Sequence, residues 1–417
     1  MTGTLHVVGA GIAGLACAVS AAQAGRKVVV YEATKQAGGR CRSFFDSQLN
    51  TTVDNGSHAI LGANPAIFSY LSAINAESEL VPVESTGEIP FVDLKNGTSW
   101  TLRPNPGLFP SWIFDAERRA AGTQALDYIK GGALLVAGKK RSVASVLKTS
   151  GNTWRNFWEP LSTAVMNTSA DQASAYLLGK ALGQAVATRR GGLRSYVPKT
   201  SLHDTFIEPA LKVLKAAGAQ IRFDTPLSAV TANSHVVELR MRSEKIAVLP
   251  HDSVVLALPP WAPAILPFLG EAFKPEASPI VNAHFQMDLE EPPPAMVGLI
   301  GGTAHWLFTR PGVVSVTVSA DQSLADAEHG EIAARLWSDA CLALNLNDQS
   351  APPSRVIVER RATPIQDASF VLNRPGPRTH AENLFLAGDW VDTGLPCTLE
   401  SAVRSGVSAA DYSRNIS

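Results

Sequence analysis

Cysteine is scarce in this chain. Four cysteines occur among 417 residues, namely Cys17, Cys41, Cys341 and Cys397. No two of them form the C-x-x-C pair that is typical of structural zinc sites and thioredoxin-like redox sites, so the sequence predicts no metal site and no dithiol chemistry. Sparse, unpaired cysteines are typical of proteins kept in a reducing cytosol.

Excess charge and long apolar runs are missing as well. The 36 basic residues nearly balance the 37 acidic ones, whereas nucleic-acid-binding proteins usually carry a basic excess, so we expect no nucleic-acid partner. The chain has no apolar run of about 18 residues that could span a membrane. No charged-then-apolar export signal precedes the first apolar strand. These absences predict a cytoplasmic protein.

What is present begins with a strand–helix–strand unit. Residues 5–8 form a short apolar run, residues 13–24 are helix formers that end at Gly25, and residues 27–31 (KVVVY) are a second apolar run. An almost wholly apolar strand is typical of a parallel sheet that is covered on both faces. This unit therefore predicts a Rossmann-type domain in a chain long enough for two or three domains.

The turn between the first strand and the helix has the pattern G-x-G-x-x-G. Gly9 permits the tight turn, Gly11 lets the backbone approach a pyrophosphate, and Gly14 lets the helix pack closely on the strand. The free N–H groups of Ile12 and Ala13 at the helix start favour phosphate charge. The alternative is a glycine turn in an unrelated unit of the same topology.

Two further elements extend this dinucleotide pattern. Glu32 ends the second strand, next to Ala33, where a carboxylate can accept hydrogen bonds from a ribose diol. Gly38 and Gly39 then let the chain run close to the ligand, and Arg40 can neutralise phosphate charge. The alternative for Arg40 is a surface arginine after a turn.

A compact polar cluster follows at residues 53–58. Gly56 and Ser57 are small enough to let the chain approach a flat ring. His58 is a candidate proton donor, because histidine is the side chain most easily tuned near neutral pH. The alternative is a histidine with a purely structural role.

The C-terminal part of the chain supplies a second ligand element. A strand over residues 384–387 ends at Gly388 and Asp389, and Asp389 can hydrogen-bond sugar-alcohol hydroxyls. Pro396 then leads into a helix whose first N–H groups, at Thr398 and Leu399, can stabilise negative charge on a ring. Ligand elements at both ends of the chain imply one discontinuous domain around an extended ligand.

With these motifs, the chain resembles the amine oxidase and phytoene desaturase superfamily of FAD enzymes. Within it, the chain is most similar to the bacterial hydroxysqualene dehydroxylases, also called squalene-associated FAD-dependent desaturases. Three stretches carry this resemblance: residues 38–43 (GGRCRS), 54–64 (DNGSHAILGAN) and 386–406 (LAGDWVDTGLPCTLESAVRSG). By the same resemblance, residues 218–230 contact the adenine, with the backbone around Leu227 facing it.

The resemblance implies non-covalent FAD and a long-chain isoprenoid substrate. An allylic alcohol, hydroxysqualene, would lose its hydroxyl as water while reduced FAD delivers hydride, giving squalene for hopanoid synthesis, and an unidentified electron donor would reduce the FAD. The departing hydroxyl needs an acid, for which His58 and Asp54 are the candidates. Departures from the family pattern include Cys397 where alanine is usual, Ser401 where glycine is usual, and Ser57 in place of a larger amide.

The predicted fold is α/β: a discontinuous Rossmann-type FAD-binding domain with an inserted α+β substrate domain. A hairpin is predicted over residues 88–103, around Asn96-Gly97. The first insert is expected to be mostly helical, and the second to hold strands and a helix. The predicted FAD-binding domain comprises residues 1–95, 205–265 and 355–417, and the predicted substrate domain comprises residues 96–204 and 266–354.

Two questions stay open at this point. Another enzyme of the superfamily, an amine oxidase or a carotenoid-type desaturase, is the first alternative, and a non-catalytic FAD-binding scaffold is the second. The aromatic stretch 109–114 (FPSWIF), next to Arg118 and Arg119, is a candidate contact with the inner membrane, and a buried tunnel wall explains it equally well.

Overall fold

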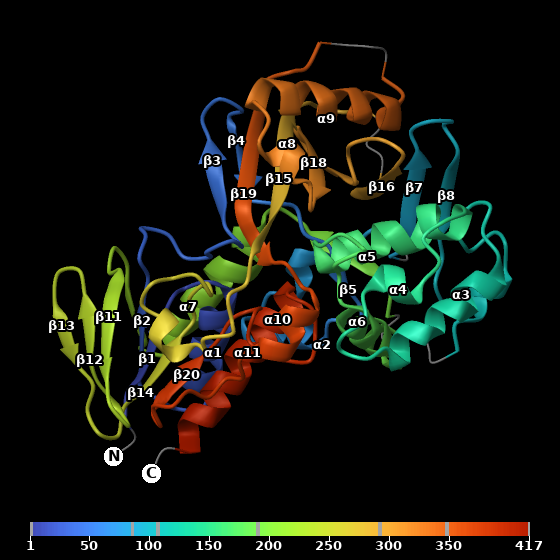
Figure 1. The fold of residues 1–417 in the computed structure, drawn as a ribbon. Helices are drawn as coiled ribbons and strands as arrows, with labels where there is room; N and C mark the ends of the chain where they lie inside the picture. Colours follow the sequence, from blue (N-terminus) through green and yellow to red (C-terminus); the bar gives the residue numbers. More distant parts are fainter. Residues whose placement is uncertain are drawn as a thin grey trace.

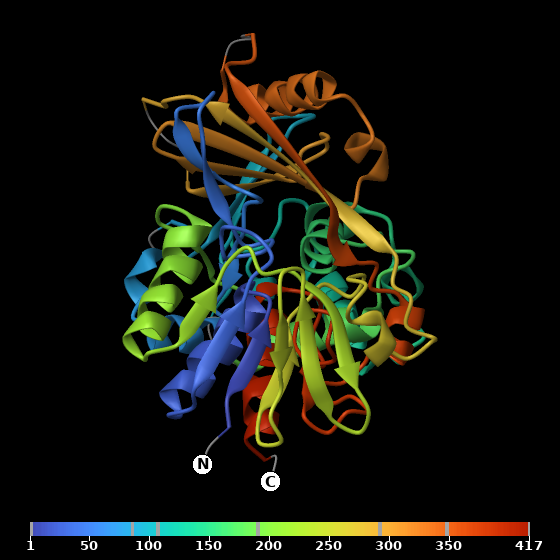
Figure 2. The ribbon, with the colours of Figure 1, turned by 90° about the vertical axis from the view of Figure 1, so that its left-hand side faces the viewer.

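The computed structural model describes residues 3–84, 87–105, 109–188, 192–290, 294–346 and 350–415. Two sheets lie one above the other, and a mainly helical region lies beside them (Figures 1 and 2). The lower sheet carries the Rossmann-type unit at the N-terminus, and both termini lie below it (Figure 1).

The lower sheet has five parallel strands in the order β10-β2-β1-β14-β20. Their residues alternate between the two faces, so that Leu5 and Val7 join one core cluster while Val8 joins another. The sheet collects segments from three distant parts of the chain, which confirms the predicted α/β class and its discontinuous Rossmann-type unit. The strands are β1 (Leu5–Val8), β2 (Val28–Tyr31), β10 (Gln220–Arg222), β14 (Ser253–Leu256) and β20 (Leu384–Leu386).

One face of this sheet is covered by helices and the other by a small antiparallel sheet. Helices α1 (Ile12–Gln23) and α11 (Leu399–Tyr412) pack so closely that a Cβ on Gly406 would lie 2.0 Å from the carbonyl oxygen of Ala13. Figure 2 shows the small sheet in front of the parallel strands. The remaining elements here are α2 (Pro65–Ala73), η5 (His203–Ile207), α7 (Glu208–Ala216), β11 (Leu227–Ala232), β12 (Val236–Met241), β13 (Lys245–Ala247) and η6 (Leu266–Phe268).

The upper sheet has seven strands in the order β19-β15-β18-β17-β16-β7-β8, with helix α9 (His329–Leu344) packed across it (Figure 1). The predicted hairpin is confirmed, because β7 and β8 pair antiparallel. The strands are β7 (Ile89–Asp93), β8 (Ser99–Leu102), β15 (Ala277–Gln286), β16 (Met296–Ile300), β17 (Trp306–Arg310), β18 (Val313–Ser319) and β19 (Ser354–Pro364).

Two predicted domain boundaries differ from this arrangement. Strand β7 was expected to belong with residues 1–95, and β19 with residues 355–417, but both lie in the upper sheet. The cause is long-range pairing: Phe91 of β7 lies opposite Gly298 of β16, where a Cβ would be 2.2 Å from the Phe91 ring. Local sequence pattern carries no signal for such a pairing.

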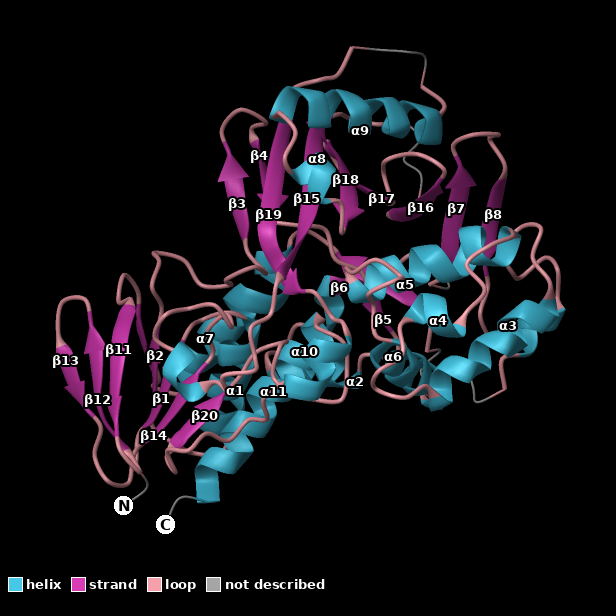
Figure 3. Ribbon diagram, in the orientation of Figure 1, coloured by secondary structure: helices cyan, strands magenta, loops and turns pink. Residues whose placement is uncertain are grey.

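Residues 111–187 are largely helical, as expected for the first insert (Figure 3). Strand β9 (Ser195–Pro198), which pairs with β5 (Ile60–Leu61) and β6 (Leu80–Pro82), was not expected. None of the helices described is long and apolar enough to cross a membrane. The helical elements are η2 (Ser111–Phe114), α3 (Ala125–Gly131), η3 (Gly132–Val136), α4 (Val143–Val146), η4 (Trp154–Trp158), α5 (Glu159–Met166) and α6 (Ala175–Ala187).

Short elements join these parts. They are β3 (Ser43–Asp46), β4 (Thr51–Asp54), β5 (Ile60–Leu61), η1 (Glu77–Glu79), β6 (Leu80–Pro82), β9 (Ser195–Pro198), α8 (Gln322–Ala325), α10 (Ala368–Asn373) and η7 (Ser413–Asn415).

Candidate functional site

A cavity of about 720 Å³ extends from the carboxyl edge of the lower sheet to the upper sheet and the helical region. At the lower sheet its walls are glycine-rich turns and the start of α1. At the other end its walls are apolar and aromatic. One continuous space therefore joins a nucleotide-type site to an apolar chamber.

The three glycines of the first turn meet different structural requirements. Gly9 has φ +104°, and a Cβ there would lie 2.4 Å from the carbonyl oxygen of Ala257. A Cβ on Gly14 would lie 1.9 Å from the carbonyl oxygen of Gly9. A Cβ on Gly11 would meet nothing within 4 Å, although Gly11 lines the cavity. The protein's own packing explains Gly9 and Gly14, whereas the space beside Gly11 fits a bound pyrophosphate.

Glu32 lies at the end of β2, in the wall of the cavity. Its carboxylate accepts hydrogen bonds from the N–H of Ala10 (2.9 Å) and from the N–H and hydroxyl of Thr34 (3.0 and 2.9 Å). Glu32 is buried, and these bonds fix its side chain against the glycine turn. The carboxylate is thus held in the place where the ribose contact was predicted.

Arg40 and Asp389 are brought together from opposite ends of the sequence. Their side chains form an ion pair at 2.6 Å, and Arg40 also donates to the carbonyl oxygen of Ala362. The prediction treated the two residues as separate ligand contacts. In the structure they form one bridge across the cavity wall, because the chain after β2 returns along the sheet edge, where Gly38 pairs with Gly11, and carries Arg40 toward the end of β20.

Arg374 is a residue of this site that sequence reasoning missed. Its buried guanidinium donates to the carbonyl oxygens of Trp390 (2.9 Å), Leu395 (2.6 Å) and Asp389, and to the hydroxyl of Ser401 (3.3 Å). It therefore fixes the loop that carries Asp389 to the start of α11. An arginine in an Arg-Pro turn gives no sequence signal for such a contact.

The hydroxyl of Ser401 forms hydrogen bonds with the loop that precedes helix α11. It shares a hydrogen bond of 2.6 Å with the hydroxyl of Thr393 and donates to the carbonyl oxygen of Asp389 (3.2 Å). Ser401 therefore ties helix α11 to the loop before it. Thr398 caps the same helix by accepting from the N–H of Ser401 (3.4 Å).

His58 and Asp54 are placed differently. His58 lines the cavity, and its Nδ1 lies 2.9 Å from the carbonyl oxygen of Gly56. Burial lowers the pKa of His58, although the Gly56 carbonyl opposes this shift. Asp54 does not line the cavity. Its carboxylate accepts from the hydroxyl of Ser43 (2.5 Å) and the N–H of Leu202 (3.0 Å) and pairs with Arg310 (3.1 Å). These contacts give Asp54 a structural role.

The apolar chamber is built by the helical region and the upper sheet. Its rings pack on each other, with Trp112 and Phe157 at 5.8 Å and Phe91 and Trp306 at 5.5 Å between ring centroids. Such a wall suits a long hydrocarbon chain. The apolar lining includes Ile89, Phe91, Leu102, Trp112, Phe157, Leu161, Val165, Leu193, Met296, Trp306 and Phe308.

A few polar side chains in the cavity wall were also missed. Asn167 and Ser195 are buried, and Asn167 Oδ1 and Ser195 Oγ have no hydrogen-bond partner within the described ranges. Glu400 accepts from the N–H groups of Ala66 (3.2 Å) and Ile67 (3.0 Å), and burial raises the pKa of its carboxyl against the effect of these two donors. Unpaired buried polar atoms are costly, so Asn167 and Ser195 are suited to contact a bound molecule.

Most of the predicted ligand residues come together in this one cavity. Of the proposed set, Gly14 and Asp54 stand outside its wall, Gly14 because it serves helix packing. The predicted residues that line the cavity are Gly9, Gly11, Ile12, Ala13, Glu32, Ala33, Gly38, Gly39, Arg40, Gly56, Ser57, His58, Leu227, Gly388, Asp389, Pro396, Thr398 and Leu399.

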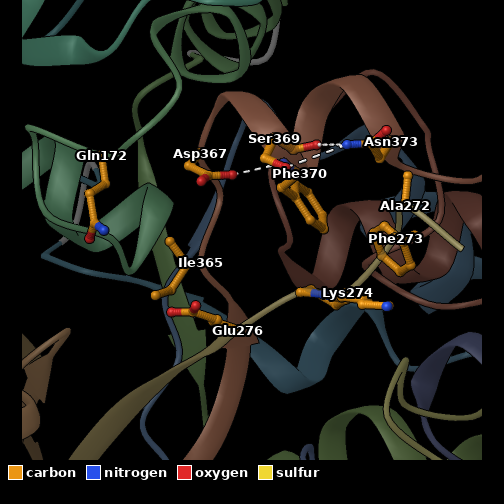
Figure 4. A pocket seen from close by; sticks show the side chains of 11 residues that line it. Gln172, Ala272, Phe273, Lys274, Glu276, Ile365, Asp367, Ser369, Phe370 and Asn373 are labelled. Carbon is orange, nitrogen blue, oxygen red and sulfur yellow. Dashed lines mark hydrogen bonds between the residues drawn. The ribbon is translucent and has the colours of Figure 1, made fainter.

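A second cavity of about 210 Å³ lies beside helix α10 (Figure 4). Its polar groups serve the helix itself. Asp367 accepts from the N–H of Phe370 (2.7 Å), and Asn373 donates to the carbonyl oxygen of Ser369 (3.0 Å). Phe273 and Phe370 form part of its wall, and Phe273 stacks on Trp390 of the large cavity. This small cavity therefore adds no binding group to the main site.

Comparison with known proteins agrees with this geometry. The family model for flavin containing amine oxidoreductases matches residues 12–412. The chain belongs to this family. Its cofactor is FAD, and it is an oxidoreductase.

Some proteins of known name match almost the whole length of this chain. The hydroxysqualene dehydroxylase of Sinorhizobium fredii is 40% identical over 416 residues, covering 99% of this chain and 98% of the relative. That of Rhodopseudomonas palustris is 40% identical over 418 residues, with the same coverage. The 15-cis-phytoene desaturase of Synechococcus elongatus is 22% identical and covers 77% of this chain and 71% of the relative.

Solved structures share the fold at low identity. An oxidoreductase from Methanosarcina mazei has a TM-score of 0.73 at 15% identity, covering 98% of this chain and 100% of the other. Cyclohexylamine oxidase from Brevibacterium oxydans has a TM-score of 0.69 at 15% identity and covers 99% of both chains. These likenesses confirm the predicted FAD-binding fold.

Proposed function

We propose that this protein reductively removes the hydroxyl group of hydroxysqualene to give squalene. The observation that carries the proposal is the 40% identity over 99% of the chain to proteins named hydroxysqualene dehydroxylase. The cavity supports it, because a glycine-lined nucleotide site opens into an aromatic and apolar chamber. A long isoprenoid with a single hydroxyl fits such a chamber.

The reaction needs one hydride and one proton. The C–O bond breaks, a C–H bond forms with the hydride, and the oxygen leaves as water after taking the proton. Bound FAD in its reduced form supplies the hydride, and an unidentified electron donor must reduce it again. The protein's part is to hold the alcohol, exclude bulk water and place a proton at the departing oxygen.

We infer that His58 supplies this proton. Its Nδ1–H donates to the Gly56 carbonyl, and the described residues offer no partner to Nε2, which leaves that atom for the substrate oxygen. Because burial lowers its pKa, the protonated form of His58 gives up its proton more readily than an exposed imidazolium does. Asp54 is not retained as an alternative, since Ser43, Leu202 and Arg310 already engage its carboxylate.

Glu400 is the second proton source worth testing. It is the carboxyl in the cavity wall whose pKa burial raises, so it keeps a proton to a higher pH than an exposed glutamate does. Its two bonds to the start of α2 argue for a structural role, because they stabilise the charged form. Comparing His58→Ala with Glu400→Gln separates the two roles.

Aromatic and apolar side chains such as Trp112, Phe157 and Met296 form the wall of the chamber and suit a hydrocarbon better than an ammonium group. The carboxylates of the cavity, Glu359 and Glu400 among them, lie elsewhere in its wall, so an amine oxidase is an alternative for the experiment below. A carotenoid-type desaturase would fit the same walls, so it is a second alternative that requires an experiment. A non-catalytic scaffold would not need the loop that Arg374 fixes beside the start of α11.

Expression in a host that accumulates hydroxysqualene and makes no squalene tests the proposal. Mass spectrometry of the host lipids should detect squalene only when the chain is present. The Gly11→Val variant is the control, because its side chain would fill the space beside the start of α1. Unchanged hydroxysqualene in cells that hold the FAD-loaded protein would contradict the proposal.

A further inference from the structure

The outer surface of the helical region carries a dense set of exposed apolar side chains. Six of the fourteen large exposed apolar residues of the described chain lie within residues 109–136. We call these six the docking face. They are Phe109 (67% exposed), Phe114 (56%), Leu126 (57%), Ile129 (52%), Leu135 (50%) and Val136 (86%).

The docking face belongs to elements whose inner sides are well packed. Leu126 and Ile129 are three residues apart on α3 and share its outer side, while Tyr128 points inward and is buried. Phe109 and Phe114 stack on each other with ring centroids 6.0 Å apart. Figure 1 places α3 at the outer edge of the molecule, away from the parallel sheet.

A single layer of rings separates the docking face from the apolar chamber. Tyr128 of α3 packs on Trp112 (5.3 Å) and on Phe157 (4.7 Å), and both of these partners line the cavity. The docking face therefore lies on the outer side of the wall whose inner side lines the chamber.

The segment that carries the docking face is rich in basic residues, unlike the chain as a whole. Residues 109–148 hold seven basic and three acidic side chains, against 36 and 37 in the full sequence. The acidic ones are Asp115, Glu117 and Asp127, of which Asp127 pairs with Lys130 at 3.5 Å. The basic ones are Arg118, Arg119, Lys130, Lys139, Lys140, Arg141 and Lys148.

We propose that the docking face binds an anionic lipid bilayer and admits the substrate from it. Exposed apolar side chains with a basic surround favour insertion at the surface of a bilayer that carries acidic headgroups. The admission of substrate rests on the proposed function, since only a long apolar substrate would be stored in the bilayer. Residues 109–114 were predicted to form either a membrane contact or a buried tunnel wall. In the structure Phe109 and Phe114 are exposed, whereas Trp112 lines the cavity.

Vesicle flotation of the FAD-loaded protein tests the proposal. The protein should float with vesicles of phosphatidylcholine and phosphatidylglycerol, and more weakly with phosphatidylcholine alone. The double variant Ile129→Ser/Val136→Ser should lower the partition coefficient about tenfold or more, because it removes apolar groups that would enter the bilayer. Leu249→Ser/Leu342→Ser, at 61% and 55% exposure, is the matched control and should bind as the unmodified protein does.

A second variant tests the charge. Lys139→Glu/Lys140→Glu should weaken flotation with the anionic vesicles and leave flotation with the neutral ones unchanged. Equal loss in both double serine variants, or equal binding to neutral and anionic vesicles, would overturn the proposal. So would self-association that Ile129→Ser/Val136→Ser abolishes, because the partner would then be a second copy of the chain.

The flotation assay and the activity assay distinguish failure of the bilayer contact from failure of the proposed function. If the protein floats as expected but releases no squalene from detergent-dispersed hydroxysqualene, the proposed function is wrong and the bilayer contact stands. If the detergent-dispersed substrate is converted but no vesicle binds, the bilayer contact is wrong and the proposed function stands.

Discussion

Replacing Gly11 and Gly14 separately by alanine tests whether the first turn is shaped for a ligand or for packing. Gly11 has φ −70° and ψ 173°, which alanine adopts without strain, and its Cβ would meet no atom within 4 Å. Gly11→Ala should therefore leave the FAD-free protein as stable as before, or more stable by about 0.4–1 kcal/mol through the unfolded chain. Gly14→Ala places a Cβ 1.9 Å from the Gly9 carbonyl oxygen and should cost about 1–3 kcal/mol.

For FAD binding we expect a large effect from Gly11→Ala, the variant that should leave the stability of the FAD-free protein unchanged. Gly11→Ala should weaken FAD binding at least tenfold, which is about 1.4 kcal/mol, because its methyl group occupies the space beside the start of α1. Thermal unfolding of FAD-stripped protein gives the stability, and flavin fluorescence titration gives the dissociation constant. An unchanged dissociation constant in Gly11→Ala, or a loss of stability equal to that of Gly14→Ala, would refute the reasoning.

Three further substitutions follow from the site. Glu32→Gln should weaken FAD binding by about 1.5–3 kcal/mol, because a charge-assisted hydrogen bond to the ribose is lost; an unchanged dissociation constant by titration would remove Glu32 from the ribose. Arg374→Met should lower the free energy of unfolding by about 3–5 kcal/mol in denaturant titration, since it strips a buried donor from three carbonyl oxygens, and a loss under 1 kcal/mol would contradict this. His58→Ala should keep FAD but slow the reaction by about 10²–10⁴-fold. Because burial lowers the pKa of His58, the rate in the unmodified protein should rise as the pH falls from neutral and level off only below this lowered pKa, and a rise that persists in His58→Ala would assign the proton to another group.

Much of the nucleotide end could be predicted because its causes are local. The spacing of Gly9, Gly11 and Gly14, the apolar strand before Glu32 and the Gly388-Asp389 pair each encode a turn at a strand end. Parallel strands align their carboxyl ends along one edge, so residues far apart in sequence meet there. The ion pair of Arg40 and Asp389 follows from that geometry, although neither motif predicts it alone.

The rest of the site depends on tertiary packing. Arg374 and Asn167 lie in segments without a motif, whereas Glu400 lies within residues 386–406, whose pattern does not show that its side chain meets the start of α2. The roles of all three arise from the loops and helices that pack around them. Asp54 was expected to be a candidate acid for the departing hydroxyl. Strand β4 instead turns its carboxylate toward Leu202 and Arg310. The place of β7 in the upper sheet was also unpredictable, because its partner strand β16 is distant in the sequence, with Phe91 opposite Gly298.

The most direct test of the central claim is a single turnover without oxygen. Chemically reduced enzyme is mixed with hydroxysqualene, and flavin absorbance and squalene are followed together. The account predicts one squalene formed for each flavin reoxidised. Persistence of reduced flavin with no squalene, together with bleaching of the oxidised enzyme by an amine or a polyene, would contradict it.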